Sequence, residues 1–263
     1  MHIRELTKKA LLVGAFFVPV FFLPGFLAHA ECPAGQNLQW QRVAKVVDGD
    51  TLKLADGRSV RLIGVNAPEL AGKGRSAEPL AEQAKRALQA LVHSSGSEVG
   101  LQLGDDAHDH YGRTLAHAFG RDGQNWEAQL IAQGLAWQVA IAPNTRLAAC
   151  QLRAEQAAQR AMFGVWRATL SAHVQRSGFQ PLAARIVAVQ RNRGGIWLEL
   201  EHGAVARIAW RHSKQAWPSD TQLQQGRWLI KGWWRDRARE QGSTQRARWL
   251  VDLQHPSMLR EWR

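Results

Sequence analysis

The chain has 263 residues and a mass of 29.4 kDa, and its 45% hydrophobic and 21% charged residues exclude disordered and fibrous classes. Lys and Arg number 34 against 22 Asp and Glu, and the net charge of +12 predicts attraction to polyanions such as nucleic acid or an anionic membrane surface. Two cysteines exclude a disulfide-stapled miniprotein and a zinc site of four cysteines.

The first 30 residues are predicted to be an export signal. A basic start is followed by an apolar run from Ala10 to Ala28 and by the small-x-small sequence Ala28-His29-Ala30. This order is typical of a secretory signal peptide cleaved after Ala30. A retained membrane anchor is the alternative, but glycines and prolines interrupt the apolar run. We therefore expect an exported protein, periplasmic or secreted, without stable membrane association after cleavage.

Export changes the expectation for the cysteines. Cys32 and Cys150 both follow the predicted cleavage site and would enter an oxidising compartment. A disulfide between them would close a loop of more than 100 residues. On the chain-entropy view, such a bond contributes about 4–5 kcal/mol. Two separate buried thiols are the alternative. Because the chain offers no other partner, we expect the disulfide.

Residues 31–170 are predicted to form five short strands and three helices. Apolar alternation and an Asp-Gly turn indicate strands at 40–47, 51–55 and 59–64. Helical periodicity marks 77–91, and short strands follow at 99–103 and 114–119. Two helices complete the region at 125–133, with Asn125 as N-cap, and at 146–162. This order favours a small barrel with helices packed beside it.

Two clusters near the start of this region combine acidic and basic groups. Asp48 and Asp50 flank a glycine at a strand end, a pattern that suits a hard cation seeking oxygen ligands. Hairpin turns also use Asp-Gly, so this pattern has a purely structural alternative. Segment 61–69 follows, with Arg61 on a strand and Glu69 after an Asn-Ala-Pro turn.

A third cluster, segment 109–113, presents Arg113 on a turn just before a strand. Arg61 and Arg113 can bind phosphate oxygens and neutralise charge that develops in a transition state. A cation at the aspartates can do the same, and Glu69 can act as general base toward water. A surface ion pair is the alternative for any one of these residues. In combination they indicate hydrolysis of a phosphodiester.

The order Asp-Gly-Asp-Thr, then Arg-Leu-x-Gly-Val-Asn-x-Pro-Glu, then Tyr-Gly-Arg resembles the staphylococcal nuclease (thermonuclease) family. The resemblance runs from about residue 43 to residue 166 and includes Asn-Trp-Glu-Ala at 125–128. It implies an α+β fold for residues 31–170, with a five-stranded OB-type β-barrel and three helices. It also implies an enzyme that uses Ca²⁺ and cuts DNA and RNA by attack of water on phosphorus.

The resemblance further implies a Ca²⁺ site at the first turn. Asp50 matches the family's metal-binding aspartate, Asp48 matches a nearby carboxylate, and the backbone carbonyl of Ala67 matches a further ligand. Asn66 stands where the family usually has a second metal-binding aspartate. Its amide oxygen can still coordinate Ca²⁺, but the site loses one negative charge, so we expect weaker Ca²⁺ binding.

The catalytic groups follow from the same resemblance. Arg61 and Arg113 match the two catalytic arginines, Glu69 matches the general base, and Tyr111 matches a tyrosine that contacts the bound nucleotide. The family's base-stacking tyrosines are missing from the segment after Leu135-Ala136, which is shorter and apolar. These departures leave a second interpretation open, a catalytically impaired nuclease-like protein that binds nucleic acid. In either case we expect a monomer.

The last third of the chain differs in charge and tryptophan content. Residues 171–263 carry 16 basic and 7 acidic residues, against 15 and 14 in residues 31–170, and hold eight of the twelve tryptophans. The polar stretch 171–181 resembles a linker, so we predict a second domain at 178–263. Expected strands lie at 184–190, 196–201, 205–210, 227–234 and 246–253. They indicate a small, mainly β domain, either OB-like or a similar barrel.

Residue parity in the last two of these strands predicts a nucleic-acid surface. Trp228, Ile230 and Trp234 share one face, which we expect to be the core. The opposite face and the partner strand are expected to form a basic ribbon suited to single-stranded nucleic acid: Lys231, Trp233, Arg235, Arg237, Arg246 and Arg248. The alternative is a barrel with core tryptophans and an incidentally basic surface, docked on the first domain.

Overall fold

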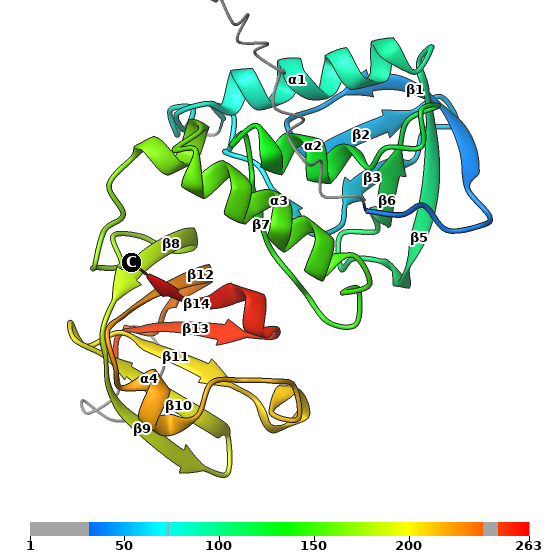
Figure 1. Cartoon of the computed structure of the whole chain (residues 1–263). Helices are drawn as coiled ribbons and strands as arrows, with labels where there is room; N and C mark the ends of the chain where they lie inside the picture. Colours follow the sequence, from blue (N-terminus) through cyan, green and yellow to red (C-terminus); the bar gives the residue numbers. More distant parts are fainter. Residues whose placement is uncertain (1–31, 73, 239–246, 263) are drawn as a thin grey trace, which may run out of the picture.

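The computed structural model describes residues 32–72, 74–238 and 247–262. They form two packed bodies, drawn one above the other in Figure 1, which we call the barrel domain (residues 32–167) and the sheet domain (residues 178–262). The predicted signal segment 1–30 lies outside the described residues. Over the described ranges, no helix has both the length and the apolar character needed to span a membrane.

The barrel domain is built on a closed five-stranded barrel in the order β1-β2-β3-β6-β5, which confirms the predicted fold of this region. Its strands are β1 (Gln39–Val46), β2 (Thr51–Leu54), β3 (Ser59–Leu62), β5 (Glu98–His108) and β6 (Thr114–Phe119). Neighbouring strands pair antiparallel except β3 with β6, which are parallel. Apolar residues from alternate positions of these strands are fully buried inside the barrel.

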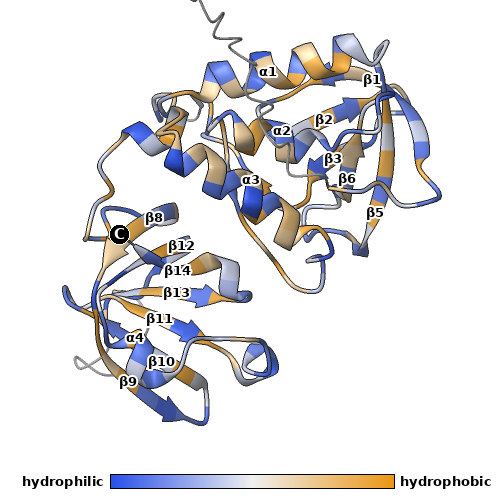
Figure 2. Cartoon of the chain, viewed as in Figure 1, coloured by the Kyte–Doolittle hydropathy of each residue, from blue (hydrophilic) through white to orange (hydrophobic). Residues whose placement is uncertain are grey.

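Three helices accompany the barrel: α1 (Ala81–Ser94), α2 (Trp126–Ala132) and α3 (Ala148–Arg160). Along α1 the hydrophobic and hydrophilic colours alternate in Figure 2, because every third or fourth residue faces the barrel. The side chain of Asn125 accepts the backbone N–H of Ala128 at 2.9 Å and so forms the expected N-cap of α2.

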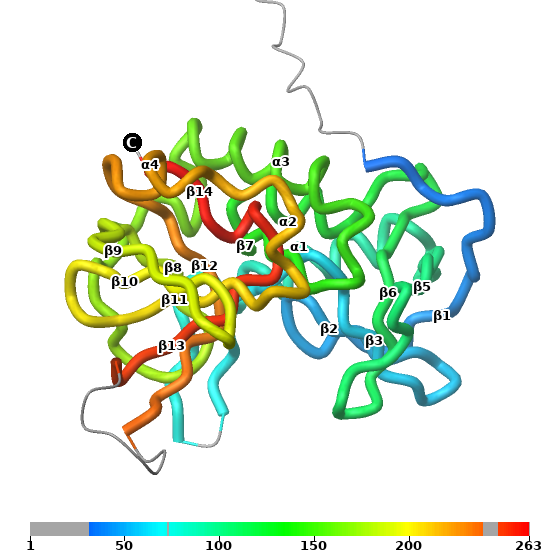
Figure 3. Tube along the Cα trace, turned by 90° about the horizontal axis from the view of Figure 1, so that it is seen from below, coloured from blue at the N-terminus to red at the C-terminus, as the bar shows by residue number. Residues whose placement is uncertain are grey.

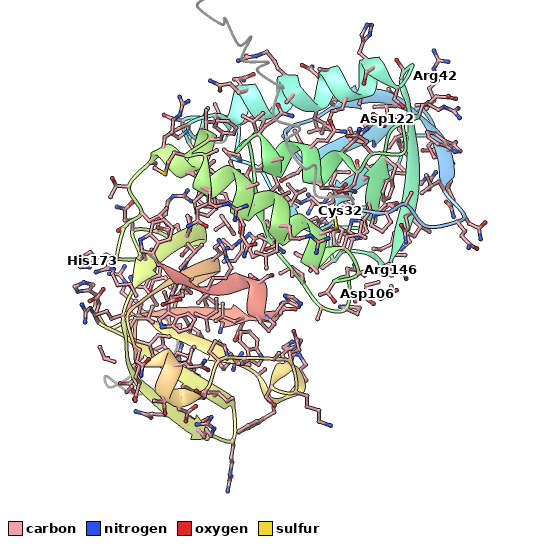
Figure 4. All side chains as sticks on the ribbon, in the orientation of Figure 1. Cys32, Arg42, Asp106, Asp122, Arg146 and His173 are labelled. Atoms are coloured by element: carbon pink, nitrogen blue, oxygen red, sulfur yellow. A yellow bond between two sulfur atoms is a disulfide. The ribbon has the colours of Figure 1, made fainter. Side chains whose placement is uncertain are left out.

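A disulfide joins Cys32, ahead of β1, to Cys150 on α3, with Cα atoms 5.4 Å apart (Figure 4). This is the pairing expected from the sequence. It ties the start of the described chain to the last long helix of the barrel domain.

A small two-stranded sheet lies outside the barrel. In it, β4 (Val65–Asn66) pairs antiparallel with β7 (Trp137–Gln138), and Asn66 stands opposite Trp137. The 3-10 helix η1 (Gly164–Arg167) closes the barrel domain. Gly164 and Gly134 pack backbone to backbone, since a Cβ on Gly164 would lie 2.0 Å from the carbonyl oxygen of Gly134. Only glycines allow this approach, which seats η1 beside the end of α2.

The sheet domain is mainly β, as predicted, but its described strands form a seven-stranded sheet that is not closed, where a five-stranded OB-like or similar barrel was expected. The strands are β8 (Gly178–Ala184), β9 (Ile186–Asn192), β10 (Gly195–Leu200), β11 (Val205–Ile208), β12 (Arg227–Asp236), β13 (Trp249–Leu253) and β14 (Leu259–Trp262). The order is β14-β12-β13-β11-β10-β9, and β8 also pairs with β12. Short helices lie at η2 (Trp210–His212), α4 (Asp220–Leu223) and η3 (Pro256–Met258).

The two strands that the sequence did not predict have weak local signals. β8 contains Pro181, which removes a backbone donor and confines such a strand to the edge of a sheet. β14 has only four residues. Both pair with β12, so their conformation depends on that long strand.

Buried side chains from both domains form one shared cluster between them. Trp137, Trp166 and Ala158 of the barrel domain pack with Leu229 of β12 and with Trp262 of β14. The rings of Trp166 and Trp262 stack with their centroids 6.3 Å apart. Figures 1 and 3 both show β12 and β14 beside α3 and β7. The outer face of β12 is therefore covered by the barrel domain around Leu229.

Candidate active site

The turn between β1 and β2 approaches two other elements of the barrel domain closely. A Cβ added at Gly49 would lie 2.6 Å from the Cβ of Ala67 and 2.7 Å from that of Ala84. Glycine between the two aspartates is thus required by packing. The close approach brings the carboxylate of Asp50 within 2.7 Å of the backbone N–H of Ala67, which donates to Oδ2.

Asp50 is the centre of a bonded group that we call the Asp50 cluster: Asp50, Arg61, Asn66 and Ala67. The Asp50 carboxylate is buried, accepts the Thr51 hydroxyl at 3.1 Å and forms an ion pair with the guanidinium of Arg61. Arg61 Nη2 also donates to Oδ1 of Asn66 at 3.0 Å. Four predicted site residues, from β3, β4 and the connections before β2 and after β4, therefore meet in space.

Asp48 adds a second carboxylate beside this cluster. Its Oδ1 accepts the backbone N–H of Asp50 at 3.0 Å. Burial, and then the negative charge of Asp50, raise the pKa of Asp48 to about 6. Two acidic groups at this turn concentrate negative charge that a bound cation would neutralise.

The donors at this turn have the chemistry of a calcium site. Within the described ranges, no three side chains of His, Cys, Asp and Glu converge as a metal-binding group. The candidate ligands are two aspartates, supplemented by the amide oxygen of Asn66 and the carbonyl of Ala67. All are oxygen donors, which Ca²⁺ prefers, so the residues present fit this ion.

Glu69 follows the Asp50 cluster by two residues and is exposed. Its carboxylate makes no hydrogen bond or ion pair with the described residues, in contrast to its backbone. The backbone N–H donates to Oε2 of Glu78 at 3.1 Å, and the carbonyl accepts the N–H of Glu78 at 2.8 Å. The side chain is therefore open to solvent on a backbone that is held in place.

Arg113 comes from the turn between β5 and β6. Asp109 Oδ2 accepts its Nε at 2.7 Å, and Asp109 Oδ1 accepts the backbone N–H of Arg113 and of Tyr111, each at 2.9 Å. Partial burial alone would raise the pKa of Asp109, but the hydrogen bonds and charge of Arg113 lower it overall. Asp109 thus stays ionised and orients the arginine.

The barrel brings Arg61, on β3, and Arg113, in the turn just before β6, to neighbouring segments. β3 and β6 pair in parallel with Arg61 opposite Leu115, and Arg113 precedes β6 by one residue. Tyr111 is 74% exposed, and the Arg113 Cζ lies 5.5 Å from the centroid of its ring. Together these residues and the Asp50 cluster offer arginine donors, acidic oxygens and an uncommitted carboxylate on adjoining segments.

The prediction that Lys231 contacts nucleic acid is wrong. Its side chain is fully buried, pairs with Glu155 of α3 and donates from Nζ to the backbone carbonyl of Gln138 at 2.8 Å. Parity placed Lys231 correctly on the face opposite Trp228 and Ile230. That face, however, packs against the barrel domain, so it is an interface at this point of β12.

The other predicted residues of the basic ribbon lie further along the sheet domain. Trp233 is 41% exposed and meets the ring of Phe179 edge-on. Arg248 pairs with Asp236 at 2.8 Å and lies over the ring of Trp249. Arg235 and Arg237 are exposed and half-buried, respectively, and Arg246 lies outside the described residues. Their contact with nucleic acid stays a prediction.

Sequence reasoning missed the charged partners at the domain interface. Glu155 is fully buried, and its Oε1 accepts the backbone N–H of Gln138 at 2.9 Å. Arg260 of β14 lies 3.5 Å from Glu155 Oε2 and donates to Gln159 at 2.8 Å. The sequence held one signal, because Glu155 falls on the buried stripe of α3 with the alanines at 154 and 158.

Known proteins match the barrel domain. A family model described as staphylococcal nuclease homologue matches residues 59–168. The chain is 31% identical over 127 residues to the thermonuclease of Staphylococcus intermedius, a match that covers 47% of this chain and 74% of that protein. It is 30% identical over 134 residues to the thermonuclease of Staphylococcus hyicus, with 49% and 77% covered. Endonuclease YhcR of Bacillus subtilis is 32% identical over 102 residues, with 36% and 8% covered.

Proposed function

Because the chain belongs to the staphylococcal nuclease family, we propose that it is an exported, Ca²⁺-dependent nuclease that hydrolyses DNA and RNA. That it is a phosphodiester-hydrolysing enzyme follows from the family itself. The calcium dependence, the export and the roles of single residues make up the proposal. The observation that carries it is the Asp50 cluster with the open carboxylate of Glu69 two residues further on.

Arg61 and Arg113 would bind the phosphate. A guanidinium has five N–H donors, and in each arginine a carboxylate uses only some of them. Asp50 and Asn66 orient the fork of Arg61, and Asp109 orients that of Arg113. The remaining N–H groups can donate to phosphate oxygens and to the extra negative charge of a phosphorane-like transition state.

Asp50, Asn66, Asp48 and the carbonyl of Ala67 would hold the calcium ion. When bound, Ca²⁺ supplies positive charge next to the phosphate. The same residues act without it as well: Asp50 fixes Ala67 and Arg61, and Asn66 accepts from Arg61. The Asp50 cluster thus orients an arginine and collects cation ligands at one point of the barrel.

Glu69 would act as the general base. Its exposed carboxylate can accept a proton from a water molecule while the water oxygen bonds to phosphorus and the bond to the leaving nucleotide oxygen breaks. The backbone of Glu69 is held at both its N–H and its carbonyl, which limits the directions open to the side chain. Tyr111, exposed beside Arg113, would contact the bound nucleotide.

Substrate contact and export form the outer parts of the proposal. Trp233, Arg235, Arg237, Arg246 and Arg248 would extend the nucleic-acid surface onto the sheet domain, where indole and guanidinium groups suit single strands. Export is supported by the signal-like segment 1–30 and by the Cys32–Cys150 disulfide, since such bonds persist in oxidising compartments.

The test is cleavage of labelled single- and double-stranded DNA by the purified chain, with Ca²⁺ and with chelator. Glu69→Gln runs beside it, and Glu82→Gln, an exposed acid on the first turn of α1, is the matched control. The proposal expects cleavage that requires Ca²⁺ and Glu69 but not Glu82.

The missing charge at Asn66 is the observation that favours the other candidate function, a nucleic-acid-binding protein with impaired catalysis. This alternative predicts no cleavage at millimolar Ca²⁺ together with tight, salt-sensitive DNA binding. That outcome would replace the proposal.

A further inference from the structure

The segment between Glu69 and Glu78 is closed by two hydrogen bonds. The Glu69 N–H donates to a side-chain oxygen of Glu78, and the Glu78 N–H donates to the Glu69 carbonyl, at 3.1 and 2.8 Å. Both backbone groups of Glu69 are therefore satisfied by one residue. Glu78 thus holds the backbone that carries the side chain of Glu69.

Glu78 is in turn bound by the segment that leads into the sheet domain. Its Oε1 forms an ion pair with Nη2 of Arg176, two residues before β8. The backbone carbonyl of Arg176 accepts from the side chain of Gln180 on β8, whose own carbonyl accepts Nε1 of Trp234 at 3.0 Å. Since Trp234 belongs to the buried core of the sheet domain, the backbone of Arg176 is linked to that core.

A second connection leads from the sheet domain to Asn66. One edge of β7 pairs with β4, so that Trp137 stands opposite Asn66. The next residue, Gln138, directs its N–H to Glu155 at 2.9 Å and its carbonyl to Lys231 Nζ at 2.8 Å. Because backbone groups of successive strand residues point to opposite edges, these two bonds hold the far edge of β7. Lys231 on β12 thus binds β7 at the edge opposite to the one that pairs with β4.

We propose that the sheet domain positions the active site of the barrel domain: Arg176 orients Glu69 through Glu78, and Lys231 holds Asn66 in place through β7. The inference rests on the roles proposed above for Glu69 and Asn66. Arg176 and Lys231 touch no reacting atom in this account, so they are positioning residues. Small displacements of a catalytic group are costly, and a shift of about 1 Å can lower a rate by up to about a hundredfold.

The first arm of the test is Arg176→Gln, with kcat and KM measured on DNA at saturating Ca²⁺. An exposed ion pair contributes little to global stability, so the melting temperature should not change. We expect kcat to fall about threefold to tenfold with KM unchanged, and Arg176→Lys to restore part of the loss. Arg191→Gln is the matched control, because Arg191 is 47% exposed against 48% for Arg176 and pairs with Asp220 inside the sheet domain.

A double-mutant cycle identifies the route of the effect. If Arg176 acts through Glu78, Glu78→Ala lowers kcat at least as much as Arg176→Gln does. Arg176→Gln then has no further effect in the Glu78→Ala background. Effects that multiply, or an Arg176→Gln variant with wild-type kcat, overturn the proposed route to Glu69.

The second arm removes the buried charges at the interface together, as Lys231→Met, Glu155→Leu and Arg260→Met in one chain. Replacing a complete buried ion cluster by apolar groups is often neutral or stabilising, so this variant is expected to fold. It loses both bonds to Gln138. The buried N–H and carbonyl of Gln138 are left without these partners, so the melting temperature should fall while the variant stays folded at the assay temperature. We expect Ca²⁺ affinity, measured by titration calorimetry on the folded variant, to fall about threefold to tenfold. Wild-type Ca²⁺ affinity in the folded variant overturns the route through β7.

Glu69→Gln, run in the same assays, separates this inference from the proposed function. Full activity of Glu69→Gln would overturn both the assigned base and the route from Arg176. Loss of activity in Glu69→Gln with wild-type kcat in Arg176→Gln would overturn only the positioning by the sheet domain.

Discussion

Two groups of buried charged side chains in this nuclease have similar make-up and different surroundings. In the Asp50 cluster, Asp50 pairs with Arg61, which also bonds Asn66. At the interface, Glu155 pairs with Lys231 and lies 3.5 Å from Arg260. Each group has a carboxylate at its centre, a cation beside it and an amide-bearing neighbour.

The two groups differ in what is left for a ligand. Both oxygens of the central carboxylate are bound by the protein in each group, for Asp50 as for Glu155. At the interface, Glu155 and Lys231 in addition have no solvent exposure.

Arg61, 14% exposed, is no more open than Arg260 at the interface, 15% exposed. The active site, however, adds Arg113, which is 33% exposed, and the open carboxylate of Glu69. Access to solvent, more than residue type, thus distinguishes a binding site from a buried group of ion pairs that joins the two domains.

The largest expected effect concerns Arg113, an active-site side chain that is accessible to solvent. Arg113→Lys keeps the positive charge but loses the fork that donates to two phosphate oxygens at once. We expect kcat on DNA to fall by about 10²–10³ with little change in stability. Arg121→Lys is the control, because Arg121 pairs with Glu98 on the surface of the barrel domain. An Arg113→Lys variant with wild-type kcat would show that charge alone suffices at this position.

Substitution of a charged residue at the domain interface should first lower the free energy of unfolding. Lys231→Met leaves the fully buried Glu155 carboxylate without its nearest cation, and such a loss typically costs about 3–5 kcal/mol. Urea denaturation of the full chain measures this change. Lys214→Met, at an exposed position of the same domain, should change the free energy of unfolding by less than about 0.5 kcal/mol. Equal free energies of unfolding for the two variants would show that the Lys231–Glu155 pair does not stabilise the protein.

The contribution of Lys231 to the stability of the protein should also depend on pH. Burial, opposed by the charge of Glu155, lowers the pKa of Lys231 from 10.5 to about 8. Between these values the unfolded chain holds a proton that the folded chain has released. Stability of the wild type relative to Lys231→Met should therefore rise as pH increases from about 8 to 10.5 and stay level below that window. A difference that is flat in pH would mean that Lys231 stays charged.

The smallest expected effect comes from adding one negative charge to the Asp50 cluster. Asn66→Asp supplies a second anionic ligand beside Asp50 and keeps an oxygen for Arg61. We expect the Ca²⁺ concentration for half-maximal activity to fall about threefold to tenfold. Asn37→Asp makes the same chemical change at an exposed position before β1 and serves as the control. No change on Asn66→Asp would argue against Asn66 as a ligand.

Much of the barrel domain could be predicted from local sequence. Alternating apolar residues and the turn at Asp56-Gly57 place β2 and β3, and Asn125 marks the start of α2. The order of Asp50, Arg61 and Arg113 along the chain indicated phosphodiester chemistry. These features are local because hydrogen bonding in turns and caps, and the period of buried residues, act within a few positions of the chain.

The tertiary structure decided what covers each face. Parity along β12 separated Trp228 and Ile230 from Leu229 and Lys231, but both sets are buried, because the barrel domain packs on the second face. Lys231 meets Glu155 across 76 positions of sequence, and no local pattern carries that pairing. The sequence determined the strands, the motifs and the chemistry of the side chains. Packing between the domains decided which charged groups stay accessible to a substrate and which are buried as ion pairs at the interface. Burial depends on residues far apart in the chain, so local sequence does not determine it.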